Sequence, residues 1–184
     1  MRFAYADPPY PGLEFFYKDD PNCAPVNFPL LISYLNEFDG WAMSLHSPAL
    51  KLLLPLCPSD TRILAWVKPF CSFKPGVNPA YAWEPVLSRG GRPRGKLKPT
   101  VRDWVASNIT LKKGLVGVKP VSFCFWIFEF LGMEPDDEFL DIFPGSGAVG
   151  LAHTAWKNQL WFQRENLEER QQSLLIDTPK ENAV

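Results

Sequence analysis

One tetrapeptide near the start of the chain has the residue types needed to bind and orient an amino group. Asp7-Pro8-Pro9-Tyr10 follows a short apolar run that predicts a buried strand. The prolines stop this strand and restrict the backbone, so the Asp7 carboxylate and the next carbonyl oxygen hold set positions. Two such acceptors can take both hydrogens of an exocyclic amino group and leave its lone pair facing an electrophile. Tyr10 adds a face on which an extruded base can stack; the alternative is a proline-rich turn without function.

A second candidate motif is glycine-rich and lies late in the chain. The run from Phe139 to Gly147 reads FLDIFPGSG, which predicts a strand, a tight turn and the start of a helix. Glycines let the backbone approach a ligand, and the amide groups of a helix start point outward. The spacing fits neither a dinucleotide-binding fingerprint nor a phosphate-binding P-loop. This turn therefore predicts a nucleotide-like ligand of another kind, or else a tight connection without any ligand.

Both motifs require a framework that brings distant segments together. Short apolar strands are expected near residues 2–6, 41–45, 62–67, 84–87, 138–143 and 160–163. Helical spacing predicts helices over 28–38, 47–56, 121–131 and 148–156, the second of them with Ser47 as its N-cap. Strands that alternate with helices predict an α/β fold with a doubly wound, mostly parallel sheet covered on both faces. In such sheets ligands bind beyond the carboxyl ends of the strands.

Composition limits the class of protein. The 184 residues suit a single domain, 1–184, and carry a net charge of −1. No apolar run is long enough to cross a membrane and no signal peptide is evident, so we expect a cytoplasmic protein without a membrane partner. Four scattered cysteines are expected to be free thiols. His46 and His153 lack neighbours at metal-ligand spacing, so we expect no metal site.

The long segment 70–118 is irregular and partly basic, and it is the only room for a recognition region. It carries basic residues and no acid between Pro85 and Arg102, and a tryptophan follows. Such a segment can contact phosphates, although a solvated loop is an equal alternative. The candidate substrate contacts are Arg89, Arg92, Arg94, Lys96, Arg102 and Trp104.

Together the motifs resemble those of amino-group DNA methyltransferases. Asp7-Pro8-Pro9-Tyr10 is similar to their catalytic motif, and Asp141-x-Phe143-x-Gly145-x-Gly147 is similar to their cofactor motif. Lys119-Pro120 before an apolar helix resembles a further motif on the cofactor side, and the order is that of the permuted beta class. The resemblance implies the Rossmann-like fold of S-adenosylmethionine-dependent methyltransferases. It also implies methyl transfer to an exocyclic amine of a DNA base, and the Asp form of the tetrapeptide favours N6 of adenine.

The resemblance also assigns roles to individual residues. The catalytic group is expected to comprise Asp7, Pro8, Pro9 and Tyr10. The cofactor S-adenosylmethionine is expected to contact Asp141, Phe143, Gly145, Ser146, Gly147, Lys119, Pro120 and Glu165. For Glu165 a solvated charge at a helix start is an equal alternative, and for Lys119 an ordinary helix start is the alternative.

Several alternatives stay open at the level of sequence. The same site could methylate RNA, a modified base or a small amine, or the fold could bind cofactor or a partner without turnover. The compact recognition region implies a short target site, a loose sequence preference, or a partner protein that supplies specificity. A homodimer is also compatible with the sequence.

Overall fold

The computed structural model describes residues 1–12, 25–71, 75–109 and 118–159. Within these residues there are six strands: β1 (Arg2–Ala6), β2 (Gly40–Ser44), β3 (Arg62–Val67), β4 (Trp83–Gly90), β5 (Trp104–Ala106) and β6 (Glu138–Asp141). The α-helices of the described segments are α1 (Phe28–Leu35), α2 (Leu50–Leu53) and α3 (Val121–Phe130), and a further helix covers the described residues 148–159. Two short 3-10 helices, η2 (Ser47–Ala49) and η3 (Leu54–Leu56), flank α2. None of the described helices is long and apolar enough to span a membrane.

The strands form one sheet in the order β5-β3-β4-β2-β1-β6. β1 pairs in parallel with both β2 and β6, and β3 pairs in parallel with β5. β4 alone runs against its neighbours, β2 and β3. A single connection from β3 back to β4 permits this antiparallel pairing, because antiparallel neighbours need no crossover helix. The expected mostly parallel α/β sheet is therefore confirmed.

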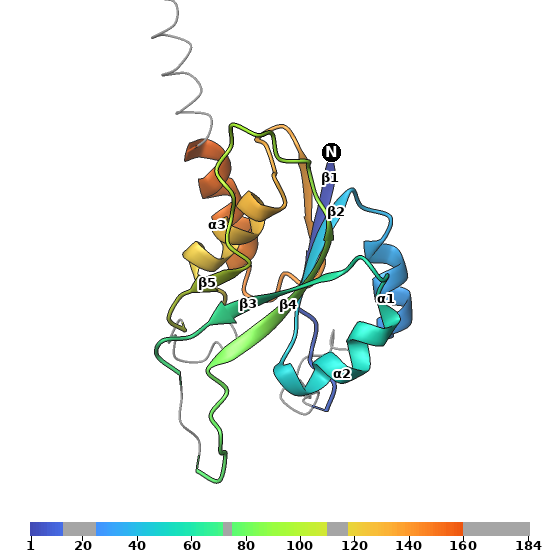
Figure 1. Ribbon diagram of the computed structural model, residues 1–184, viewed down its shortest axis with the longest axis vertical. Helices are drawn as coiled ribbons and strands as arrows, with labels where there is room; N and C mark the ends of the chain where they lie inside the picture. Colours follow the sequence, from blue (N-terminus) through green and yellow to red (C-terminus); the bar gives the residue numbers. More distant parts are fainter. Residues whose placement is uncertain (13–24, 72–74, 110–117, 160–184) are drawn as a thin grey trace, which may run out of the picture.

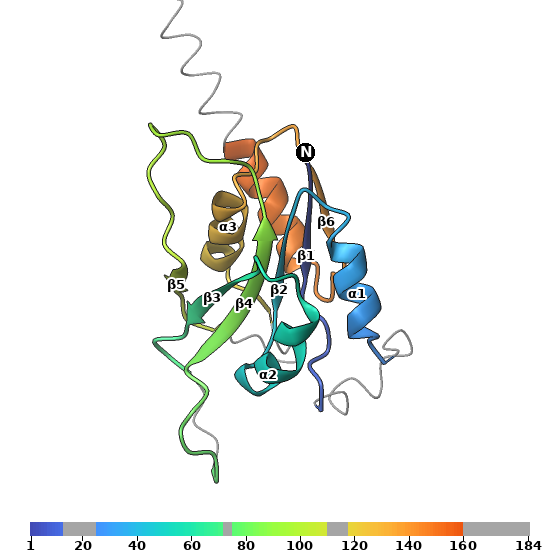
Figure 2. The same ribbon diagram turned by 45° about the vertical axis from the view of Figure 1, so that its right-hand side comes forward.

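Helices cover both faces of the sheet, as Figures 1 and 2 show. The side chains of β1 alternate between the two faces, and all four from Phe3 to Ala6 are almost fully buried. Phe3 and Tyr5 pack in one apolar cluster with α3 and helix 148–159, whereas Ala4 and Ala6 pack in another with α1. A strand that is buried on both faces needs a continuous apolar sequence, which is the pattern that β1 has.

The predicted elements are largely present, with local differences. The helix expected over 28–38 begins at Phe28, where Asn27 Oδ1 accepts the amide of Leu30 at 3.1 Å, but it ends at Leu35. The helix expected over 47–56 is divided into η2, α2 and η3, because Pro55 at the start of η3 lacks an amide to continue the α-helical ladder. Ser47 is not its N-cap, since His46 holds that position.

Some strands differ from their predicted bounds. β1 and β3 have the predicted bounds, whereas β4 extends to Gly90 and β6 ends at Asp141. β5 was not predicted, because three residues carry no readable alternation and form a strand only by pairing with β3. The strand expected over 160–163 lies outside the described residues. The described cysteines, Cys57, Cys71 and Cys124, are free thiols as predicted.

Candidate active site

The two candidate motifs meet at one edge of the sheet. β1 and β6 are parallel neighbours, and Tyr5 lies opposite Asp141 in their register. Both strands therefore end at the same edge, where β1 continues into Asp7 and β6 continues into the glycine-rich turn. The amide of Ile142 donates to the carbonyl of Tyr5 at 2.9 Å and extends this pairing into the turn. Residues separated by most of the chain are thus brought together, as the sequence predicted.

Asp7 is held by two partners at once. Its Oδ2 accepts a hydrogen bond from Lys119 Nζ at 2.7 Å, and its Oδ1 accepts one from the Tyr10 hydroxyl at 3.1 Å. The Lys119 side chain is only 4% exposed, whereas that of Asp7 is 22% exposed. A charge-assisted bond of this length in a partly buried position is stronger than the bond between neutral phenol and carboxylate. Lys119 therefore fixes the position of Asp7.

Glu84, near the start of β4, is a member of this site that the sequence analysis did not single out. Its Oε1 pairs with Lys68 Nζ at 2.5 Å, and its Oε2 accepts from the Tyr10 hydroxyl at 3.3 Å. Lys119 Nζ lies 3.9 Å from the same Oε2. A signal was present in the sequence, because an acid within the otherwise apolar strand Trp83–Leu87 needs a partner once it is buried.

The two lysines of the site share an aromatic support. Lys68 Nζ lies 5.1 Å and Lys119 Nζ lies 5.6 Å from the ring centre of Trp66, which is buried in β3. Both ammonium groups are thus attracted by the same indole ring. With Asp7 and Glu84 they form a cluster of two positive and two negative side chains. We call these four residues, together with Tyr10, the Asp7 cluster.

Tyr10 is fixed through both its ring and its hydroxyl. The ring stacks on His46, with 5.3 Å between centroids and an interplanar angle of 5°. Burial raises the pKa of the Tyr10 phenol well above its usual value, and the negative charges of Asp7 and Glu84 add to the rise. The phenol is therefore neutral at physiological pH and donates its proton. Burial also lowers the pKa of His46, so the stacked imidazole is neutral.

Lys119 and Pro120 connect the helix α3 to this edge. Pro120 is the N-cap residue of α3 and has extended backbone angles, so it directs Lys119 away from the helix. The sequence analysis placed Lys119 on the cofactor side as a supporting residue. The structure adds a direct contact between the ammonium group and Asp7 of the tetrapeptide, while the charge of Lys119 also lowers the pKa of Asp141. The Lys119-Pro120 pair therefore belongs to the geometry of the Asp7 cluster. A role of Lys119 toward the cofactor stays a prediction.

The carboxylate group of Asp141 is buried. Both of its oxygens are inaccessible to solvent and have no hydrogen-bond partner among the described residues. Burial raises its pKa to about 6, with a further rise from the nearby charge of Asp7. The amide of Phe143 lies close enough to lower it in part without the geometry of a full hydrogen bond, and the charge of the Lys119 ammonium also lowers it. A buried acceptor of this kind is costly unless a ligand supplies the missing partner.

The turn after Asp141 is shaped by two glycines. Gly145 and Gly147 have φ of 45° and 74°, a region that residues with a side chain rarely adopt. A Cβ at Gly147 would meet no atom within 4 Å, and one at Gly145 would meet only the carbonyl oxygen of Phe143 at 3.9 Å. The glycines are thus required by the backbone and not by local crowding. Ser146 is exposed between them, and helix 148–159 follows.

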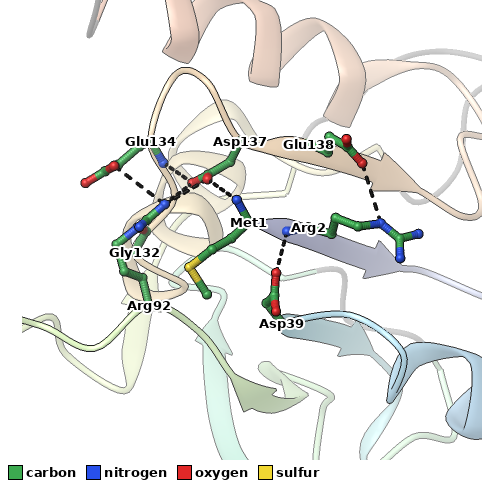
Figure 3. A network of polar contacts seen from close by, with 8 residues as sticks. All are labelled: Met1, Arg2, Asp39, Arg92, Gly132, Glu134, Asp137 and Glu138. Carbon is green, nitrogen blue, oxygen red and sulfur yellow. Dashed lines mark hydrogen bonds and ion pairs between the residues drawn. The ribbon is translucent and has the colours of Figure 1, made fainter.

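Most of the predicted basic contacts lie elsewhere. Arg89 pairs with Asp60 at 2.8 Å, Arg92 with Asp137 at 2.7 Å, and Arg94 with Glu129 at 3.4 Å. Asp137 also accepts a hydrogen bond from the amino group of Met1, as Figure 3 shows. Because Met1 directly precedes β1, Arg92 lies at the edge where β1 begins. Asp7 lies at the other end of that strand, and five strand residues span about 16 Å. These three arginines therefore lie away from the tetrapeptide, and their contact with a substrate stays a prediction.

The remaining predicted residues have other positions. Trp104 begins β5 opposite Ala65, and the Arg102 guanidinium lies 5.3 Å from its ring centre. Lys96 is exposed. Glu165 lies outside the described residues. A cavity of about 420 Å³ also opens at the edge opposite Asp7, between Arg92, Arg94 and Trp156, and it shares no lining residue with the Asp7 cluster. No group of three metal-binding side chains occurs in the described part of the chain.

Comparisons with known proteins find similar structures but no similar family profile or curated sequence. No family profile matches the chain, and no curated protein matches its sequence. Among solved structures, the M1.HpyAVI–SAM complex matches with a TM-score of 0.58 and 16% identity, over 85% of this chain and 78% of that one. M1.HpyAVI by itself matches with a TM-score of 0.54 and 16% identity, over 84% and 76%. This chain therefore shares the fold of M1.HpyAVI, a protein whose structure is also known in complex with SAM.

Proposed function

We propose that this chain is an S-adenosylmethionine-dependent methyltransferase that acts on the exocyclic amino group of a DNA base, with N6 of adenine as the acceptor. The observation that carries the proposal is the position of Asp7 and Asp141 at the ends of adjacent parallel strands. One carboxylate suits an amine that accepts a methyl group, and the other suits a cationic ligand. The match to M1.HpyAVI in complex with SAM supports S-adenosylmethionine as the cofactor.

The residues after β6 fit S-adenosylmethionine. Asp141 offers two buried carboxylate oxygens that have no hydrogen-bond partner in the described part of the chain, and an ammonium group of the cofactor would satisfy them. Gly145 and Gly147 leave open space beside the turn, and Phe143 contributes an aromatic side chain. When bound, the cofactor supplies a methyl group on a positively charged sulfur. The protein groups at this turn bind and orient it.

The Asp7 cluster fits the acceptor amine. Asp7 and the carbonyl oxygen of Pro8 would accept the two N–H hydrogens, and the nitrogen lone pair would then face the donor side of the site. The Asp7 carboxylate also stabilises the positive charge that develops on nitrogen as the methyl group arrives. Tyr10 provides the aromatic surface for the base, and His46 supports that surface from one side.

Exposed aromatic side chains support a nucleic-acid substrate. Phe70 follows the end of β3, and Tyr81 and Trp83 precede or begin the antiparallel β4. All three therefore lie toward the edge of Asp7, and all three are exposed. Their segment carries no acidic residue between Lys68 and Trp83. Base stacking on exposed aromatic rings is a sequence-tolerant mode of nucleic-acid binding, and these residues replace Arg89, Arg92 and Arg94 as the proposed contacts near the target base.

The direct test is methyl transfer. The purified chain is incubated with methyl-labelled S-adenosylmethionine and unmethylated DNA, and the nucleosides are separated after digestion. Label in N6-methyldeoxyadenosine is expected. Label in N4-methyldeoxycytidine would correct the acceptor, and label only in a parallel RNA reaction would overturn the DNA assignment. Absence of label from every nucleic acid, with cofactor binding intact by calorimetry, would overturn the proposed reaction.

A further inference from the structure

In the Asp7 cluster both carboxylate oxygens of Asp7 already accept a hydrogen bond, so a target amine has to compete for one of them. Lys119 occupies Oδ2 at 2.7 Å and the Tyr10 hydroxyl occupies Oδ1 at 3.1 Å. The proposed function, on which this inference rests, requires one of these oxygens for the target amine. The Lys119 bond joins two charged groups and is shorter, so it is the harder one to replace. Each carboxylate oxygen can accept a second hydrogen bond, but of the two partners present the Tyr10 hydroxyl is the one that an amine displaces more readily.

Glu84 offers the hydroxyl a second position. The phenol has one proton, yet two carboxylate oxygens face it, Asp7 Oδ1 at 3.1 Å and Glu84 Oε2 at 3.3 Å. A single proton cannot make two full hydrogen bonds, so this arrangement is shared between the acceptors. Once an amine takes Asp7 Oδ1, the hydroxyl can turn wholly to Glu84. It then avoids the cost of a buried donor without an acceptor.

The environment of Glu84 keeps that second position fixed. Lys68 binds Oε1, which leaves Oε2 directed at the hydroxyl. Lys119 lies 3.9 Å from Oε2 and 2.7 Å from Asp7 Oδ2, so one ammonium group supports both acceptors. The Glu84 side chain is only 18% exposed. Its backbone is paired with Trp66 in the β3–β4 ladder, where both lysines also find their aromatic support.

We propose that Glu84 is a positioning residue that takes over the Tyr10 hydroxyl when the target amine binds Asp7. In this exchange no covalent bond forms or breaks and no proton is transferred. The Tyr10 hydroxyl keeps a hydrogen-bond acceptor, Glu84, while the Tyr10 ring remains stacked on His46. Glu84 thus acts on substrate binding through Tyr10, without contact with the reacting atoms.

The test uses Glu84→Ala, Tyr10→Phe and the double variant. In Glu84→Ala the hydroxyl has only Asp7 left as acceptor and competes with the amine, so KM for DNA should rise about tenfold while kcat changes less. Tyr10→Phe keeps the ring and removes the competitor, so its KM should stay near that of the unmodified protein. In the double variant KM should fall back toward the Tyr10→Phe value. A double variant as impaired as Glu84→Ala would overturn the proposal, provided that the unmodified protein is active.

Two controls separate this idea from simple loss of structure. Glu84→Gln retains an oxygen acceptor and should raise KM less than Glu84→Ala does. The pKa of Tyr10, followed by NMR of tyrosine labelled at the ring carbon that bears the hydroxyl, does not depend on activity. It should fall in Glu84→Ala, because one of the charges that raise it is removed, and stay constant in Asp60→Ala at the other edge. An unchanged pKa in Glu84→Ala would overturn the inference, whereas an inactive unmodified protein with the expected pKa change would count against the proposed function.

Discussion

Lys119 Nζ lies 2.7 Å from Asp7 Oδ2, although 112 positions separate the two residues in the sequence. One belongs to the segment before α3 and the other to the loop after β1. Because the Lys119 side chain is almost fully buried, its charge has to be balanced within the protein. The ion pair therefore connects the folding of the core to the position of the Asp7 carboxylate.

The first prediction concerns this ion pair. Lys119→Met leaves Asp7 without its strongest partner, so the free energy of unfolding should fall by about 3 kcal/mol, the low end for a buried pair because Asp7 is partly exposed. Methyl transfer should fall by more than tenfold, since Asp7 is no longer fixed. Urea unfolding and initial rates give the two values. Lys96→Met, at an exposed lysine, is the control, and equal effects in both variants would contradict the role of the pair.

The second prediction separates the two halves of the site. Asp7→Ala removes an acceptor of the target amine and should abolish methyl transfer, while binding of S-adenosylmethionine changes little. Calorimetry measures binding and the labelled-methyl assay measures transfer. Asp60→Ala removes an aspartate at the opposite edge and should leave both unchanged. Equal loss of binding and transfer in Asp7→Ala would show that the proposed division of labour is wrong.

The third prediction concerns the glycine turn. Gly145 has a φ of 45°, which a β-branched side chain tolerates poorly. Gly145→Val should therefore distort the turn and weaken cofactor binding at least tenfold before it affects the global stability. Gly95→Val is the matched control, because Gly95 has open space and no positive φ. Cofactor affinity that is the same in both variants would exclude the turn as part of the cofactor site.

The fourth prediction is a pH dependence at Asp141. Its pKa is raised to about 6 in the folded protein, against about 3.9 in an unfolded chain. The folded state therefore favours the protonated acid, and the charged form destabilises the fold as pH rises from about 4 through 6. Asp141→Asn should raise the free energy of unfolding at pH 8 by about 2 kcal/mol and by much less at pH 4. Urea titrations at the two pH values test this.

The same titration should govern the cofactor. An ammonium group binds the charged carboxylate better than the neutral acid, so affinity for S-adenosylmethionine should increase as pH rises through about 6. Asp141→Asn should bind more weakly and lose this dependence. A pH profile that is the same in both proteins would remove Asp141 from the cofactor site.

The fifth prediction concerns the network in Figure 3. Burial opposes the charge of Asp137, but hydrogen bonds from the Met1 amino group and Arg92 outweigh this effect and lower its pKa. The network thus stabilises the fold above the unfolded pKa of about 3.9 and loses its effect as pH falls through the lower folded value. Asp137→Asn should cost about 3 kcal/mol at pH 7. Glu138→Gln, which reaches only the exposed Arg2 at 3.5 Å, should cost little.

Local patterns in the sequence were sufficient for the main elements. The apolar runs of β1 and β3 gave the observed bounds, and helix α3 ends one residue before the predicted limit. The two chemical motifs could also be recognised, because each follows directly from a predicted strand. Parallel neighbours end at the same edge of a sheet, so their meeting was a topological consequence of the predicted fold.

Other features depended on the order and direction of the strands. The antiparallel course of β4 places Glu84 at the edge of Asp7 and sends Arg89 to the opposite edge, where Arg92 and Arg94 follow. The sequence shows a basic segment there, but it contains no information on which edge that segment reaches. Charge and residue type are local properties of the chain, whereas the partner of a buried charge is chosen by strand pairing. For this reason the sequence determined which residues could do chemistry, and only the tertiary structure decided which of them act together.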